Sequence, residues 1–183
     1  SPARATLLAP RTAPTTGRLR ARPPGDCVSH VAFDPTLSDA ERRAALFAGA
    51  VLVHSPRASA VELCEFARGL LEAAFHPHEP QLAQHQLPVH DYARIAAELK
   101  PAFIHHPESK RLVRALLDDH GCDPDRTYFD VPRLRSSTSD GYLTTGIAYA
   151  FHPHRDTWYS APTCQINWWL PIQAITRDNG LAF

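Results

Sequence analysis

The chain has 183 residues, 44% of them hydrophobic and 21% charged, proportions that are ordinary for one soluble globular domain. Its 19 basic residues balance its 19 acidic residues, so the charge gives no reason to expect nucleic acid or an anionic membrane as a partner. Since no apolar stretch reaches membrane-spanning length and the four scattered cysteines form no C-x-x-C pair, we expect no membrane anchor, reduced thiols and a cytoplasmic location.

The N-terminal segment differs in composition from the rest. Residues 1–25 contain five arginines and five prolines but no acid. A segment of this kind buries too little apolar surface to offset its conformational entropy, so we expect residues 1–27 to form a disordered tail. An organelle transit peptide is the less favoured alternative, because no amphipathic face is evident. Residues 28–183 are expected to form a single domain.

A helix and a strand are predicted directly after this tail. Ser38 and Glu41 have the spacing of a capping box, which predicts a helix to about Phe47 that Gly49 ends. The short apolar run 50–54 is then bounded by turn residues. It favours a buried strand.

The next helix is the clearest periodic pattern in the chain. Ser59 and Glu62 suggest a second capping box at its start. Apolar residues then recur at helical spacing, which predicts a helix. These residues are Val61, Cys64, Ala67, Leu71, Ala74 and Phe75.

Histidines and prolines dominate residues 76–90. Although His-rich tracts can bind metals, no ligand spacing is recognisable, and an irregular surface loop is the favoured interpretation. A helix is predicted from about Asp91 to Lys100, with Pro101 either ending it or starting another turn. A further helix is predicted from Pro107 to Gly121.

Strand-like patterns replace helical ones beyond Gly121. Alternation predicts strands over 127–135, 147–156 and 164–172, and Asp140-Gly141 is a hairpin signal between the first two. Helices followed by strands indicate an α+β protein in which the N-terminal helices pack on an antiparallel sheet.

The end of the second of these strands carries a candidate metal site. His154 and Asp156 are two residues apart, so on a strand they project from the same face. An imidazole and a carboxylate are two parts of the 2-His-1-carboxylate arrangement that binds non-haem Fe(II). His152 shares the face and is an alternative ligand. The letters His-Arg-Asp also begin a kinase catalytic loop, but Ala161 stands where that loop needs Asn.

The following strand offers a second set of candidate residues. Gln165, Asn167 and Trp169 share one face, and two amides with an aromatic ring could contact a small ligand. A solvated polar face is the simpler alternative for the amides. Trp168 points the opposite way and is expected to fill the core.

Residues 147–158, 165–171 and 177–180 together resemble the Fe(II)/2-oxoglutarate dioxygenases of the phytanoyl-CoA hydroxylase type. The resemblance rests on the His154-x-Asp156 strand, the Trp-bearing strand and the Asn179-Gly180 turn that begins ten residues after Trp169. It implies an incomplete double-stranded β-helix, a jelly-roll or cupin-like sheet. It also implies that Fe(II) is bound by His154 and Asp156 and that Trp169 lies beside 2-oxoglutarate.

The activity implied by this resemblance is hydroxylation of a small organic substrate by dioxygen, coupled to decarboxylation of 2-oxoglutarate to succinate. The family's distal histidine and 2-oxoglutarate-binding arginine would lie beyond Phe183, so we expect the chain to be a C-terminally truncated dioxygenase-like domain with little turnover of its own. The alternative is a non-catalytic cupin-like protein that binds a ligand or a partner.

Overall fold

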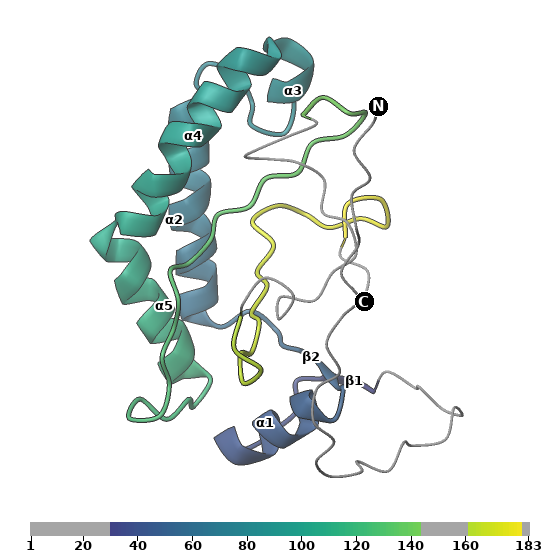
Figure 1. The fold of residues 1–183 in the computed structure, drawn as a ribbon, viewed down its shortest axis with the longest axis vertical. Coiled ribbons are helices and arrows are strands. Elements are labelled where there is room, and N and C mark those ends of the chain that lie inside the picture. Colours follow the sequence, from purple (N-terminus) through teal and green to yellow (C-terminus); the bar gives the residue numbers. More distant parts are fainter. Residues whose placement is uncertain (1–29, 144–160, 181–183) are drawn as a thin grey trace, which may run out of the picture.

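The computed structural model describes residues 30–143 and 161–180. The described residues form five helices and two strands (Figure 1): β1 (Val31–Phe33), α1 (Asp39–Phe47), β2 (Val51–Val53), α2 (Ala58–Phe75), α3 (Ala83–Gln86), α4 (Val89–His105) and α5 (Pro107–Asp119). The predicted tail over 1–27 and the predicted strand over 147–156 lie outside the described residues.

The three long helices α2, α4 and α5 form a layer in which α2 packs against both others. After α5 the chain returns along this layer in an extended conformation, and residues 161–180 also run beside it, while α1 and the two strands lie at one end (Figure 1). The extended segments therefore cover the helices on the side where the sequence predicts a sheet.

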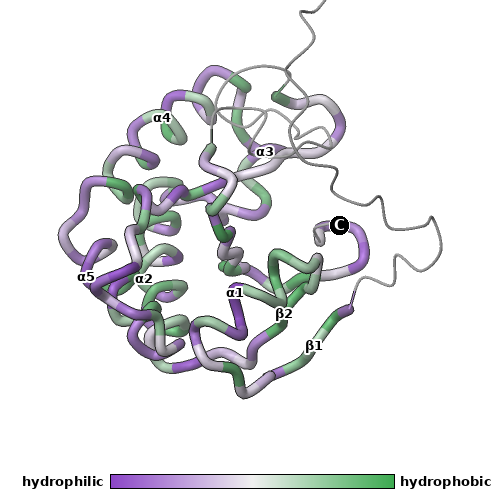
Figure 2. The backbone as a smooth tube through the Cα atoms, turned by 60° about the horizontal axis from the view of Figure 1, so that its bottom comes forward, coloured by the Kyte–Doolittle hydropathy of each residue, from purple (hydrophilic) through white to green (hydrophobic). Residues whose placement is uncertain are grey.

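The core lies between the three long helices and the extended chain. Leu112 is 1% exposed, and it belongs to one buried cluster with residues of α2 and α4 and with Leu134 and Leu143 of the extended segment. Hydrophobic and hydrophilic colours alternate along the long helices in Figure 2, as expected of helices with one buried side. The packing that defines this fold is thus helix on helix.

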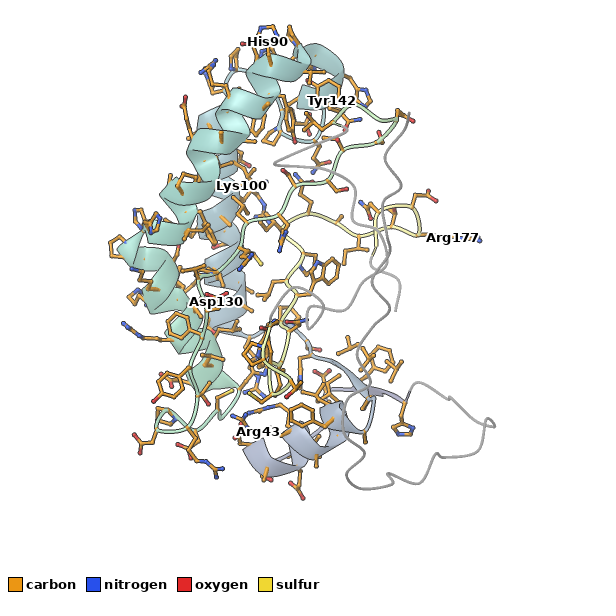
Figure 3. All side chains as sticks on the ribbon, in the orientation of Figure 1. Arg43, His90, Lys100, Asp130, Tyr142 and Arg177 are labelled. Atoms are coloured by element: carbon orange, nitrogen blue, oxygen red, sulfur yellow. The ribbon has the colours of Figure 1, made fainter. Side chains whose placement is uncertain are left out.

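An aromatic stack fixes the far end of the extended segment to the helices. The ring of Tyr92 lies 5.0 Å from that of Phe75 and 5.5 Å from that of Tyr142, which is labelled in Figure 3. The Tyr142 hydroxyl donates a hydrogen bond of 2.6 Å to the carbonyl of Leu87. The turn before Tyr142 holds Asp140 and Gly141 at φ of 54° and 65°, so the turn signal is confirmed, although no strands flank it among the described residues.

The capping box at α1 is confirmed. The Ser38 hydroxyl accepts the backbone N–H of Glu41 at 3.3 Å, and the Glu41 carboxylate accepts the backbone N–H of Ser38 at 2.9 Å. Gly49 follows the helix at φ 96°, a conformation in which a Cβ would be strained.

We therefore expect Ser38→Ala to lower the free energy of unfolding by about 1 kcal/mol, because it leaves one N-terminal amide of α1 without its acceptor. Urea unfolding followed by far-ultraviolet circular dichroism measures this loss. Ser38→Asp, which restores an acceptor, should recover most of it, and equal losses in both variants would contradict the capping role.

The second predicted capping box is wrong. Helix α2 begins at Ala58, with Arg57 as its N-cap residue and no side-chain cap. The Ser59 hydroxyl instead donates to the Asp119 carboxylate, and the Ser59 amide donates to the same carboxylate at 3.3 Å. Ser59 is buried for this reason, and the contact ties the start of α2 to the end of α5.

The boundaries of the later helices confirm part of the prediction. Helix α5 begins at Pro107, as expected, and Gly121 follows it at φ 63°. Pro101, however, lies inside α4, and the helix continues through it to His105. The buried side of this segment includes Leu99 and Phe103 on either side of the proline, so tertiary packing outweighs the local cost of proline.

The predicted jelly-roll or cupin-like sheet is wrong. The described residues contain one two-stranded sheet, in which β1 and β2 pair in parallel with Val31 opposite Val51. Residues 127–135 and 164–172 belong to no strand, and the second range has a turn at Cys164 and a bend at Ile172. Alternation therefore predicted two strands that do not form. It does not supply a neighbouring chain, and a strand also needs a partner for its amide and carbonyl groups.

No helix in residues 30–143 and 161–180 combines the length and apolar character needed to cross a membrane. The three cysteines in these residues, Cys64, Cys122 and Cys164, form no disulfide.

Candidate functional site

The amide and tryptophan residues proposed for ligand binding do share one face. Along residues 165–170 burial alternates: Ile166, Trp168 and Leu170 are partly buried, and the side chains between them are exposed. Trp169 is 49% exposed, and the Gln165 side-chain amide donates to the Asn167 side-chain oxygen at 2.7 Å. His154 and Asp156, the predicted metal ligands, lie outside the described residues.

Helix α2 and the region after α5 hold this segment in place. The Cys64 thiol donates to the Pro171 carbonyl at 3.7 Å, and the Arg68 guanidinium donates to the Ile172 carbonyl at 2.9 Å. On the other side, the Trp168 ring lies 4.9 Å from the His120 ring. Trp168 therefore packs inward as predicted, and Trp169 is left facing outward.

The Asn179-Gly180 turn is also formed. The Asn179 side-chain oxygen accepts the backbone N–H of Thr176 at 2.5 Å, and the Asn179 backbone N–H donates to the Thr176 carbonyl at 3.4 Å. The turn places Arg177 at the outer side of the molecule, away from the helical layer (Figure 3).

A pocket of about 140 Å³ lies on the inner side of the Trp168 segment, where α1, β2 and the ends of α2 and α5 meet. Its lining residues are Asp34, Pro35, Thr36, Leu37, Arg42, Leu52, His54, Arg57 and His120. Sequence reasoning missed this site because His54 and His120 are far apart in the chain. The available signal was that a histidine lies close to each of two glycines that follow helices: His54 comes five residues after Gly49, and His120 directly precedes Gly121.

Asp34 forms one wall of the pocket in a left-handed conformation, with φ 46°, which aspartate tolerates better than most residues. Its carboxylate accepts the Ser55 backbone N–H at 2.6 Å and the Ser55 hydroxyl at 2.7 Å. These bonds, the backbone one first, lower the pKa of Asp34 below its ordinary value. The acid is therefore ionised and already engaged as an acceptor.

Two arginines, Arg42 and Arg57, also line the pocket, and their charges are neutralised to different extents. Arg42 is buried and donates to the His120 carbonyl and to the Asp39 carboxylate, which also pairs with Arg43. Arg57 is exposed and donates to the Asp119 carbonyl. Among the described residues Arg57 forms no direct ion pair. Its charge nevertheless helps, after the hydrogen bonds from Ser55 and Ser59, to lower the pKa of Asp34 and of Asp119, so both carboxylates lie near it.

The two histidines are in edge contact, with ring centroids 4.8 Å apart. His120 is 8% exposed, and no hydrogen bond to its ring nitrogens is found within the described part of the chain. Burial first, and then the charge of Arg57, lowers the pKa of His120 to about 4. The same causes lower the pKa of His54. Both rings are thus neutral near pH 7.

This pKa predicts an acid-sensitive fold. The unfolded chain binds a proton at His120 below about pH 6.5, whereas the folded chain does so only near pH 4. Stability should therefore fall by up to about 3 kcal/mol as the pH drops through this window. The charged and titratable groups that face His120 are Arg57, Arg42, His54 and Asp119, and the hydroxyl and backbone N–H of Ser59 hold the pKa of Asp119 below its ordinary value.

Urea unfolding between pH 7 and 4 measures this effect. His120→Gln should flatten the pH dependence, whereas His90→Gln, at a side chain 81% exposed, should leave it unchanged. An unaltered slope in His120→Gln would assign the acid sensitivity to other groups.

Comparison with known proteins gives no assignment. No family model, curated protein or solved structure matches the chain. Within residues 30–143 and 161–180, no group of three His, Cys, Asp or Glu side chains could hold a metal ion.

Proposed function

We propose that this chain carries part of the active site of an Fe(II)/2-oxoglutarate-dependent oxygenase that acts on a small organic molecule. The observation that carries the proposal is the His154-x-Asp156 pair followed by a segment on which Gln165, Asn167 and Trp169 share an exposed face. The jelly-roll sheet forms no part of the proposal. It rests on the donor set and on this face.

The donor set suits the metal. A neutral imidazole and a carboxylate are hard-to-borderline ligands of the kind that hold Fe(II) and leave positions open for other ligands. Iron bound there would activate dioxygen, so that one oxygen atom enters succinate as 2-oxoglutarate loses CO₂ and the other forms the hydroxyl group of the product. The carboxylate of Asp156 also lowers the net charge that bound iron brings to the site.

The residues on the exposed face have complementary roles. The side-chain amides of Gln165 and Asn167 can donate to carboxylate or carbonyl oxygens of a bound organic acid. Trp169 offers a large apolar surface that can cover one side of such a ligand and exclude water from it. The packing of Trp168 on His120 fixes the orientation of this face from behind.

An anaerobic titration with Fe(II), read by nuclear magnetic resonance, tests the proposal. Paramagnetic broadening should reach the ring of His154 and the indole of Trp169 first, and 2-oxoglutarate added afterwards should shift the side-chain amides of Gln165 and Asn167. Iron that broadens only the histidines of residues 76–90 would contradict the proposal.

A non-catalytic binding protein is the second candidate. The exposure of Trp169 favours it, because a half-exposed tryptophan is also typical of a surface that contacts a ligand or partner. Shifts of Trp169 on addition of 2-oxoglutarate without any iron binding at His154 would favour this candidate over the oxygenase.

A further inference from the structure

We propose that the pocket between Arg57 and His120 binds the oxyanion of a small molecule, a carboxylate or a phosphate group. The inference goes beyond the proposed oxygenase and does not depend on iron, because all of its residues lie in described segments apart from His154 and Asp156.

The first argument is the charge at the pocket wall. Arg57 supplies a guanidinium that forms no direct ion pair among the described residues, although Asp34 and Asp119 lie near enough to feel its charge. One of its terminal nitrogens donates to the Asp119 carbonyl, which restricts its orientation. A guanidinium held in this way has further N–H groups for a carboxylate or phosphate, and such charge-assisted bonds are about twice as strong as neutral ones.

The second argument is the buried imidazole. His120 lines the pocket, is 8% exposed, and has no hydrogen-bond partner for its ring nitrogens among the described residues. A neutral imidazole carries one N–H, which an anionic ligand in the pocket could accept. The neighbouring His54 ring, 4.8 Å away, offers a second donor from another element.

The acidic residue of the pocket is compatible with an anion. Asp34 turns its carboxylate oxygens to the amide and hydroxyl of Ser55, which reduces the repulsion that a bound anion would meet. Arg42 shares the Asp39 carboxylate with Arg43, so some positive charge remains on this side, and Arg42 also fixes the backbone of His120 through the His120 carbonyl. The volume of about 140 Å³ suits a small anionic group and excludes a large one.

The test uses the 183-residue chain at pH 7.5 without iron. Inorganic phosphate and succinate are titrated separately, and chloride at matched ionic strength controls for screening. We expect saturable shifts of the ring resonances of His54 and His120 with at least one of the two probes. A response to phosphate alone identifies a phosphate group as the ligand, and a response to succinate alone identifies a carboxylate.

Two substitutions with opposite expected effects on anion affinity distinguish a change in binding from a loss of folding. Arg57→Gln should weaken binding about tenfold, whereas Asp34→Asn should tighten it several-fold because it removes the acid and keeps a side chain that tolerates the same backbone. Arg94→Gln, on the exposed side of α4, is the matched control and should change nothing.

Shifts no larger than those caused by chloride, or the same affinity in the Arg57→Gln and Asp34→Asn variants, would overturn the inference. Because the readout needs no iron, a failure here leaves the oxygenase proposal standing, and a failure of iron binding at His154 leaves this pocket standing.

Discussion

Replacement of Leu112 by alanine should destabilise the protein by about 3 to 5 kcal/mol. Leu112 is 1% exposed and lies on the side of α5 that packs against α2. Truncation removes buried methyl groups and leaves a cavity that three helices can fill only by moving together. The loss exceeds that at a half-buried leucine because no solvent can enter the space.

Guanidinium unfolding followed by circular dichroism measures this change. Leu82→Ala, at a side chain 46% exposed, is the matched control and should cost less than about 1 kcal/mol. Similar losses in the two variants would mean that the helical layer is not the source of stability. A change in the slope of the unfolding curve would instead indicate an altered denatured or native state.

The same core shows which part of the fold was predictable. Leu112 and Leu116 lie one helical turn apart in α5, as do Leu71 and Phe75 in α2, and this period is a local property that the sequence displays directly. The capping box of Ser38 is likewise local, and the structure confirms it. Ser59 shows the limit of this reasoning, because the acceptor it finds is Asp119, at the end of another helix.

The pairing of strands is the part of the fold that could not be predicted from the sequence. The alternation of Ile166, Trp168 and Leu170 with exposed residues was read correctly as an extended chain with two faces. What lies beside that chain is a non-local property, and here helix α2 provides contacts through Arg68 where a sheet was expected. A period of two therefore predicts which side chains share a face better than it predicts a sheet.

The candidate site residues likewise fall into those that the sequence predicts and those that it does not. The shared face of Gln165, Asn167 and Trp169 follows from spacing, and the structure has it. The pocket of His54, Arg57 and His120 does not, because it depends on how α1, α2 and α5 meet. No pattern in one segment marks a site assembled from three.

Replacement of Asp156 by alanine should weaken Fe(II) binding by at least about 100-fold, because it removes the one anionic ligand of the proposed iron site. His154→Ala should have an effect of similar size. The double variant should lose less than the sum of the two single losses. The reason is that both side chains bind the same ion, so the loss of either one already breaks the chelate. Anaerobic calorimetry with Fe(II), supported by the broadening of the Trp169 indole resonance, measures both.

The controls use residues of the same chemistry elsewhere in the chain. Asp178→Ala, in the exposed turn before Asn179, and His90→Ala, on the exposed surface of α4, should leave the iron affinity unchanged. Additive effects of His154→Ala and Asp156→Ala would place the two side chains at separate ions and remove the basis of the oxygenase proposal. Partial recovery of iron binding in Asp156→Glu would support the oxygenase proposal, because glutamate keeps the carboxylate ligand on a longer side chain.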